Sequence, residues 1–290
     1  MNQLNQRDIN ILRCIAEHRV ITIAQVALLL GRNEGSLANR SRMLEKSGLI
    51  ASMPNLAGTR QGRPQKVLLL AGEGVAALRR AGEVIGAKAA RRLASKRVPD
   101  LNHQLLVNGF HVAAHEMAAQ MGSLSYQFIL PDSPLAAARP IDWRLHGGEV
   151  NGKAGDARTF IPDGVLCLTH EQLRKSLLFF LELDTGSESV AQVTEKVVGY
   201  QAYFRSEQYR RYQDVFGQSF RGFRLLLLAA SETRLASLCS MIQQIPATGF
   251  VWLAFTDHVN EAGLGGMVWR RGGLTDQLHE SILGSQSPAS

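Results

Sequence analysis

The chain has 290 residues, a formal net charge of +7 and hydrophobic residues at 45% of its positions. This length favours two domains, each with its own core. The three cysteines, at positions 14, 167 and 239, are too few and too far apart to predict a disulfide framework or a zinc ribbon. No run reaches the roughly 18 apolar residues of a membrane span, and the polar start does not resemble a signal peptide. We therefore expect a soluble, cytoplasmic protein without a membrane partner.

The positive charge is concentrated in the first hundred residues. Residues 1–100 contain 17 Lys and Arg against 7 Asp and Glu, whereas the remaining residues contain 15 against 18. This asymmetry is typical of a module that binds a polyanion, joined to a nearly neutral one. Nucleic acid is the usual polyanion, and a membrane surface is the alternative.

Three short helices are predicted before residue 50. Apolar residues at helical spacing indicate a first helix that ends near His18 and a second that begins after Thr22. Thr22 and Gln25 have the spacing of a capping box. A third helix is predicted from about residue 35 to 47, and its inward face would comprise Leu37, Met43 and Leu44. Three short helices with tight turns predict a helix-turn-helix.

A hairpin wing is predicted to follow these helices. Residues 51–65 are rich in proline and glycine, and the apolar strand 66–70 comes next. In a winged helix, the third helix enters the major groove of duplex DNA and the wing grips phosphate. The candidate DNA contacts on the third helix and in the wing are Ser36, Asn39, Arg40, Arg42, Lys46, Arg60 and Arg63. The alternatives are a three-helix unit with ordinary solvated faces and a winged helix that binds protein.

A basic linker is predicted between the two domains. A helix from Val75 to Arg80 closes the first domain, which we place at residues 1–80. Residues 81–100 are rich in Ala, Gly, Lys and Arg. Within them, Lys88, Arg92 and Lys96 would share one face of a helix along which a DNA backbone can run, unless the segment is a simple tether. The second domain is expected at residues 101–283, before a disordered tail at 284–290.

The second domain is predicted to be an α/β sandwich with a mixed central sheet. A helix at 101–121 and a strand at 124–130 precede an irregular segment at 131–159. The later elements are strands at 160–168, 176–184, 223–230 and 250–256 and helices at 188–205 and 232–244. Wholly apolar runs, such as 177–180, are typical of central strands that are covered on both faces.

The strand at 176–184 carries two carboxylates at the end of an apolar run. Glu182 and Asp184 project to the same side, because strand side chains alternate between faces. Asp163 joins them if the strand at 160–168 lies alongside. Three close carboxylates repel one another, so a divalent metal or a lysine must balance their charge.

Three segments of the second domain stand out: the strand IPDGVLCL, the strand and turn FFLELDTGSES, and the helical EKVVGYQAYF. Together with the basic winged-helix start, they resemble the plasmid replication-relaxation proteins. The resemblance extends over most of the chain. It implies a sequence-specific, double-stranded DNA-binding protein of a bacterial plasmid or mobile element, acting in replication control, transfer or transcriptional regulation. We also expect a homodimer.

The second domain is also similar to the PD-(D/E)XK nuclease fold, in which acids on two strands and a lysine surround a magnesium ion. The resemblance assigns Asp163 to the first acid and Glu182 to the second, while Asp184 stands in place of the lysine. Lys196 would then substitute for that lysine. Magnesium held by Asp163, Glu182 and Asp184 would activate water, which makes a DNA endonuclease the alternative function. In a purely structural alternative, Lys196 pairs with a buried Glu182 and Asp184 caps the following turn.

Three histidines, His103, His111 and His115, fall on one face of the helix at 101–121. A His pair four residues apart can bind zinc, although no nearby acid or cysteine completes the ligand set. A solvated or dimer-facing surface is the alternative.

Overall fold

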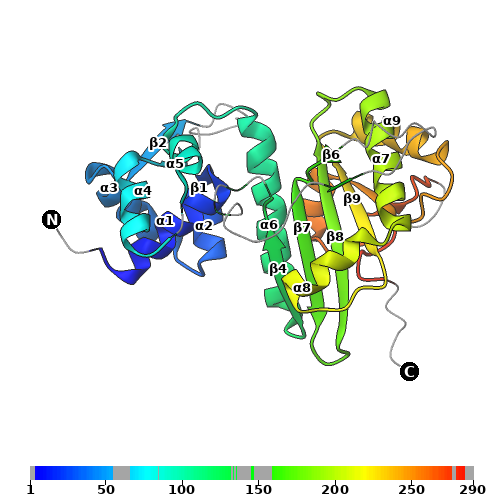
Figure 1. Cartoon of the computed structure of the whole chain (residues 1–290), viewed down its shortest axis with the longest axis horizontal. Coiled ribbons are helices and arrows are strands. Elements are labelled where there is room, and N and C mark those ends of the chain that lie inside the picture. The colour runs from blue at the N-terminus through cyan, green and yellow to red at the C-terminus, as the bar shows by residue number, and fades with distance from the viewer. Residues whose placement is uncertain are drawn as a thin grey trace. The chain divides into compact units, whose positions relative to one another are not determined.

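The computed structural model describes residues 4–54, 66–83, 85–131, 133, 135, 145–146, 159–275 and 279–284. The chain divides into two compact units, whose elements are labelled in Figure 1. Unit 1 comprises Met1–Val112 and Asp132–Ile141, and unit 2 comprises Ala113–Pro131 and Asp142–Ser290. The division falls within helix α6 (Leu101–Met121), eleven to twelve residues beyond the start of the second domain expected from the sequence. Within the described ranges, no helix has both the length and the apolar character that a membrane crossing requires.

Unit 1 combines short helices with a small antiparallel sheet. The helices are α1 (Gln6–His18), α2 (Ile23–Leu29), α3 (Glu34–Lys46), α4 (Gly72–Arg80) and α5 (Ala87–Ala94). The strands are β1 (Ile21–Thr22), β2 (Ile50–Pro54) and β3 (Lys66–Leu70), with β3 between the other two. Both pairings are antiparallel. The three predicted helices and the predicted strand at 66–70 are therefore present, and β1 and β2 are additional.

Local capping signals explain where the first three helices begin. Capping boxes start α1 and α2, and the second is the predicted pair of Thr22 and Gln25. At α3, the Asn33 side chain accepts a hydrogen bond from the backbone N–H of Ser36. Apolar side chains of these helices then pack into one core that includes Leu12, Ile15, Val26, Leu37 and Leu44.

Two features of unit 1 differ from the predictions. Met43 is 51% exposed, because its position on α3 is turned away from the side that buries Leu37 and Leu44. The stretch at 81–100, predicted as a linker, contains α5, and its Leu93 is buried in the core of unit 1. Burial of such an apolar side chain favours a packed helix over a solvated tether.

Unit 2 is built on a six-stranded mixed sheet in the described part of the chain. In spatial order the strands are β11 (Arg270–Arg271), β10 (Val251–Phe255), β9 (Phe223–Ala229), β8 (Lys175–Asp184), β7 (Gly164–His170) and β4 (Leu124–Ile129). Strands β8, β9 and β10 are parallel, and the other neighbours are antiparallel. Figure 1 shows β7, β8 and β9 side by side. The predicted mixed sheet is confirmed.

The helices of unit 2 connect and cover these strands. They are α7 (Val190–Arg205), α8 (Tyr212–Phe216), α9 (Glu232–Gln243), α10 (Thr256–Ala262) and the 3-10 helix η2 (Gln208–Arg211). A separate pair of short strands, β5 (Leu145–His146) and β6 (Thr159–Phe160), is antiparallel. The predicted helices at 188–205 and 232–244 correspond to α7 and α9. Helix α8 is too short to produce a recognisable periodicity in the sequence, and α10 buries one large apolar side chain, Val259, which forms no pattern.

Helix α7 packs on the sheet through aromatic side chains. Phe180 of β8 lies between Tyr200 of α7 and Phe223 of β9, at ring-centroid distances of 5.7 Å and 4.8 Å. Alternate residues of a strand share one face, so Glu182 and Asp184 lie on the same face of β8 as Phe180. This packing therefore directs both carboxylates toward the helical layer.

Candidate nucleic-acid interface and buried ion pairs

Helix α3 exposes one continuous side to solvent. Residues three and four positions apart lie on the same side of a helix. The exposed side chains at such spacings, called the α3 face below, are Ser36, Asn39, Arg42, Met43 and Lys46. Leu37, Ser41 and Leu44 are buried on the other side. The α3 face therefore offers polar, basic and apolar side chains to a partner, while the core residues of the helix stay buried on its other side.

The charge of the α3 face is positive. Arg42 donates a hydrogen bond to the side-chain oxygen of Asn39, and among the described residues neither Arg42 nor Lys46 forms an ion pair. Glu45 lies outside this face and accepts a hydrogen bond from Ser52 Oγ at 2.5 Å. Two cationic groups thus remain available to an anionic partner.

Arg40 has a different environment from the other predicted DNA contacts. Its Nε and Nη2 atoms donate to the two carboxylate oxygens of Asp8, at 2.6 Å and 2.5 Å. Asp8 is fully buried, and although burial opposes its ionisation, the hydrogen bonds from Arg40 and the Asn5 backbone lower the pKa of Asp8. The Arg40 charge is therefore compensated within the chain, and this side chain ties α3 to α1.

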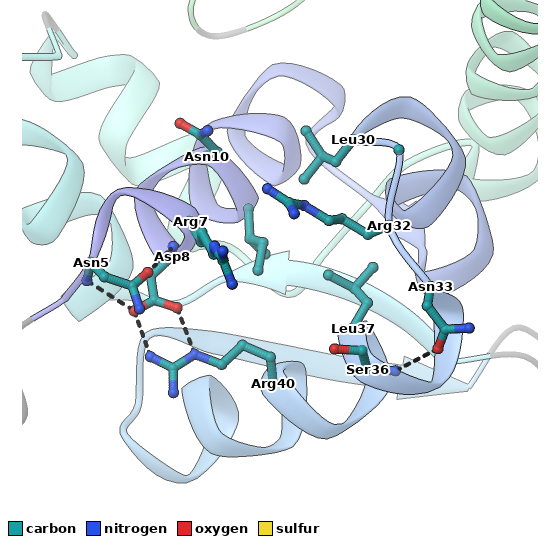
Figure 2. Close-up of a pocket in the computed structure, with 12 residues that line it drawn as sticks. Asn5, Arg7, Asp8, Asn10, Leu30, Arg32, Asn33, Ser36, Leu37 and Arg40 are labelled. Carbon is teal, nitrogen blue, oxygen red and sulfur yellow. Dashed lines mark hydrogen bonds and ion pairs between the residues drawn. The ribbon is translucent and has the colours of Figure 1, made fainter.

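A pocket of about 460 Å³ adjoins the first half of α3. It is lined by the start of α1, the turn between α2 and α3, and the first two turns of α3. In Figure 2, Arg7 and Arg32 extend toward the middle of this pocket from different elements. Both are exposed, and among the described residues neither forms an ion pair. Sequence reasoning did not single them out, because they belong to no periodic pattern and are 25 residues apart.

The remaining candidate DNA contacts belong to the predicted wing and linker. Arg60 and Arg63 lie outside the described residues. Lys88 is exposed and Arg92 is half-buried on α5, whereas Lys96 lies beyond the end of that helix. The single helical face expected for these three residues is therefore interrupted.

Glu182 is buried in unit 2 and is held by two side chains of α7. Lys196 Nζ lies 2.9 Å from its Oε2 atom, and the Tyr200 hydroxyl donates to Oε1 at 2.7 Å. Burial raises the pKa of Glu182 to about 7, while the charge of Lys196 opposes this shift. Lys196 also contacts Glu188 at 3.0 Å, and despite burial these two glutamates raise its pKa above the ordinary value. The pairing of Glu182 with Lys196 is the one that the structural alternative predicted.

Asp184 is neutralised by an arginine from α9. Arg234 donates to both carboxylate oxygens, at 3.1 Å and 2.7 Å, and also to the Glu188 backbone carbonyl at 2.7 Å. The backbone N–H of Gly186 donates to Asp184 at 2.6 Å, so Asp184 caps the turn as the structural alternative predicted. The sequence did not reveal Arg234, because it is 50 positions away and only the fold brings it to β8.

Asp163 lies beside β8, as the pairing of the two strands predicted. Its carboxylate accepts a hydrogen bond from the backbone N–H of Leu183 at 2.8 Å, and its negative charge contributes to the raised pKa of Glu182. Among the described residues, no group of three or more His, Cys, Asp or Glu side chains is arranged to hold a metal ion. The three acids are instead held by backbone amides and by basic side chains.

The histidines of α6 pair with other aromatic side chains. His111 stacks on His18, with ring centroids 5.0 Å apart and 2.9 Å between ring nitrogens. His115 contacts the Tyr126 hydroxyl at 3.1 Å. His111 and His115 thus have separate partners, which accounts for them without zinc.

The family of the chain follows from its sequence profile. Residues 12–218, more than half of the chain, match the profile of the family described as Replication-relaxation. This chain belongs to the Replication-relaxation family. A search of curated proteins finds no match.

The Replication-relaxation match spans parts of both units. It begins within α1 and ends after α8, so it contains the α3 face and the ion pair of Glu182 with Lys196. The family resemblance expected from the sequence is therefore confirmed.

Proposed function

We propose that unit 1 is a winged helix-turn-helix domain that binds duplex DNA through the α3 face. The order of elements supports this proposal, since α1, β1, α2 and α3 precede the antiparallel strands β2 and β3. In such a domain, α3 is the helix that enters the major groove. The observation that carries the proposal is the exposed α3 face, whose cations Arg42 and Lys46 have no acidic partner among the described residues.

The residues of the α3 face suit complementary roles in the major groove. Asn39 matches the adjacent acceptor and donor of adenine, and Arg42 matches guanine or a phosphate. Lys46 suits a phosphate, because an ammonium group is a compact point charge. Met43 adds an apolar surface that fits the methyl group of thymine, which explains why a large apolar residue is exposed here.

The wing is proposed to add phosphate contacts through Arg60 and Arg63. Strands β2 and β3 pair from Ile50 with Leu70 to Pro54 with Lys66, so the chain between them leaves β2 and enters β3 at the same end of the strand pair. A wing in this position grips the backbone beside the groove that α3 occupies.

The family supports a role in the replication, transfer or transcription of a plasmid or other mobile element. In each of these processes, sequence-specific binding to duplex DNA locates the protein on its target. We therefore propose DNA recognition as the molecular activity.

The contacts of the acidic cluster support a structural role rather than the endonuclease alternative. A magnesium ion at Glu182 would compete with the Lys196 ammonium and the Tyr200 hydroxyl, which already occupy the two carboxylate oxygens. We expect the purified protein to leave duplex DNA intact with Mg²⁺. Cleavage that is lost in both Asp163→Ala and Glu182→Ala would overturn this expectation.

Duplex binding is tested by titrating labelled DNA with protein at several NaCl concentrations. Phosphate contacts release counterions, so the affinity should fall steeply as salt rises. The double variant Arg42→Ala/Lys46→Ala should lose roughly 10- to 100-fold in affinity. Binding that ignores salt would refute the proposal.

A matched control separates the α3 face from net charge alone. Lys175 and Arg221 are exposed in unit 2, so Lys175→Ala/Arg221→Ala removes the same charge without changing the α3 face. This control should bind DNA nearly as well as the wild type. Equal losses in both double variants would show that binding depends on overall charge and not on α3.

A further inference from the structure

The pocket beside α3 combines two arginines with polar side chains. Besides Arg7 and Arg32, its lining includes Asn10, Asn33 and Ser36. The carboxylate in the lining is Asp8, and its two oxygens already accept hydrogen bonds from Arg40. The Arg7 and Arg32 charges therefore face the pocket without compensation from this acid (Figure 2).

Two like charges that point into one pocket repel each other unless an anion lies between them. The guanidinium group presents paired N–H donors that match the oxygens of phosphate. The first turns of both α1 and α3 also line the pocket, and the N-terminal end of a helix carries a partial positive charge. These features favour a phosphate over a neutral ligand.

The pocket is continuous with the α3 face, because Ser36 belongs to both. A helix that enters the major groove is flanked by the phosphates of the groove edge. A group bound between Arg7 and Arg32 would lie at the N-terminal end of the α3 face, where such a phosphate is expected.

We propose that this pocket is a phosphate-binding site, formed by Arg7 and Arg32, that clamps a backbone phosphate of the bound duplex. The assignment to a DNA phosphate rests on the proposed function of unit 1. A free phosphate group is the other source of the same chemistry, and the experiment below distinguishes the two.

The first arm measures duplex affinity over a series of NaCl concentrations for Arg7→Ala, Arg32→Ala and Arg13→Ala. Arg13 is the matched control, since it lies on α1, is exposed and pairs with Glu83 outside the pocket. Each pocket variant should bind about tenfold more weakly, and the slope of log affinity against log salt should fall by about 0.9 per lost phosphate contact. Arg13→Ala should retain the wild-type slope. Circular dichroism checks that every variant is folded.

The second arm measures the melting temperature in inorganic phosphate against chloride at equal ionic strength. Phosphate should raise the melting temperature of the wild type and of Arg13→Ala, but not of Arg7→Ala or Arg32→Ala, because a ligand stabilises only the state that binds it. If Arg7 and Arg32 affect the salt slope as expected, the occupant is a DNA phosphate. If only phosphate stabilisation depends on Arg32, the pocket holds a free phosphate group.

The two proposals can fail separately. If the wild type does not bind duplex DNA but phosphate stabilises it through Arg32, the proposed function fails and the phosphate site stands. If duplex binding depends on Arg42 while the Arg7 and Arg32 variants match Arg13→Ala in both arms, the phosphate site is refuted. If Arg7→Ala and Arg32→Ala change neither the salt slope nor the stabilisation by phosphate, the phosphate site is refuted, whether or not the α3 face binds DNA.

Discussion

The α3 face of unit 1 and the acidic cluster of unit 2 differ in how their charges are compensated. On the α3 face of unit 1, Arg42 and Lys46 are exposed and have no acidic partner among the described residues. In unit 2, Glu182 and Asp184 are buried, and each is matched by a basic residue from a neighbouring helix. Exposed cations contribute little to folding and remain available to a ligand, whereas buried ions are stable only as pairs. The contrast supports the proposed recognition role of the α3 face, and it indicates that the ion pairs of unit 2 hold that fold together.

The largest effect is expected when one partner of the buried pair is removed. Lys196→Met keeps most of the side-chain volume but leaves Glu182 without its cation, and should lower the free energy of unfolding by about 3 to 5 kcal/mol. Urea denaturation followed by circular dichroism measures this loss. The double variant Lys196→Met/Glu182→Gln should recover much of it, because no buried charge remains. A double variant as unstable as the single one would contradict the pairing.

The second prediction concerns Arg40, whose guanidinium is paired with Asp8 and would become available to DNA if that carboxylate were removed. Asp8→Asn removes the charge that holds Arg40, and should lower the free energy of unfolding by about 1 to 3 kcal/mol. The same change should strengthen duplex binding. It should also steepen the slope of log affinity against log salt by about 0.9, the value expected for one additional phosphate contact. Binding titrations at several salt concentrations measure this gain.

The double variant Asp8→Asn/Arg40→Ala is the control for this change. Adding Arg40→Ala should remove the gain if the released guanidinium causes it. If the increase in duplex affinity persists in the double variant, it is due to the lost negative charge of Asp8 and not to Arg40.

The third prediction concerns His18, a buried titratable group in unit 1. Its Nδ1 lies 2.8 Å from the Cys14 carbonyl oxygen and its ring stacks on His111, while burial lowers its pKa to about 4. The unfolded chain binds a proton near pH 6.5 and the folded chain does not, so stability should fall as the pH drops from 6.5 toward 4. From pH 7 to pH 5 the expected loss attributable to His18 is about 2 kcal/mol.

Urea denaturation of the wild type and of His18→Gln at both pH values measures this contribution. The variant cannot titrate at this position, so its stability should change less between the two pH values. Equal losses in the two proteins would assign the pH dependence to other groups.

The smallest effect is expected at Met43. Because this side chain is 51% exposed, Met43→Ala should change the free energy of unfolding by less than about 0.5 kcal/mol. If it contacts a thymine methyl group, the variant should lose a few-fold in affinity for its selected site and nothing on nonspecific duplex. Replacing thymine by uracil in the site should produce the same loss in the wild type and none in the variant.

Much of unit 1 could be predicted because its signals are local. The spacing of Thr22 and Gln25 predicted the start of α2, and apolar periodicity predicted α1 and α3. Periodicity failed at Met43, because Met43 and Leu44 are adjacent apolar residues and the sequence does not reveal that the core buries Leu44 alone. It also gave no sign of β1, a two-residue strand whose existence depends on pairing with β3.

In unit 2, the sequence predicted which residues would come together but left their chemistry open. Strand alternation placed Glu182 and Asp184 on one side, and strand pairing brought Asp163 alongside. The same pattern fitted a metal site and a set of ion pairs. The packing of α7 and α9 on the sheet brings Lys196 and Arg234 to these acids, and no local pattern specifies that packing.

By itself, the sequence determined the positive N-terminal module, the order of its helices and the apolar central strands, because charge, capping and periodicity act over a few residues. The tertiary structure decided which charges are compensated. Arg40 meets Asp8 across 32 positions and Arg234 meets Asp184 across 50, whereas Arg7 and Arg32 converge on a shared pocket. Such pairings depend on how distant segments pack, and the strength of each depends on the burial that packing creates.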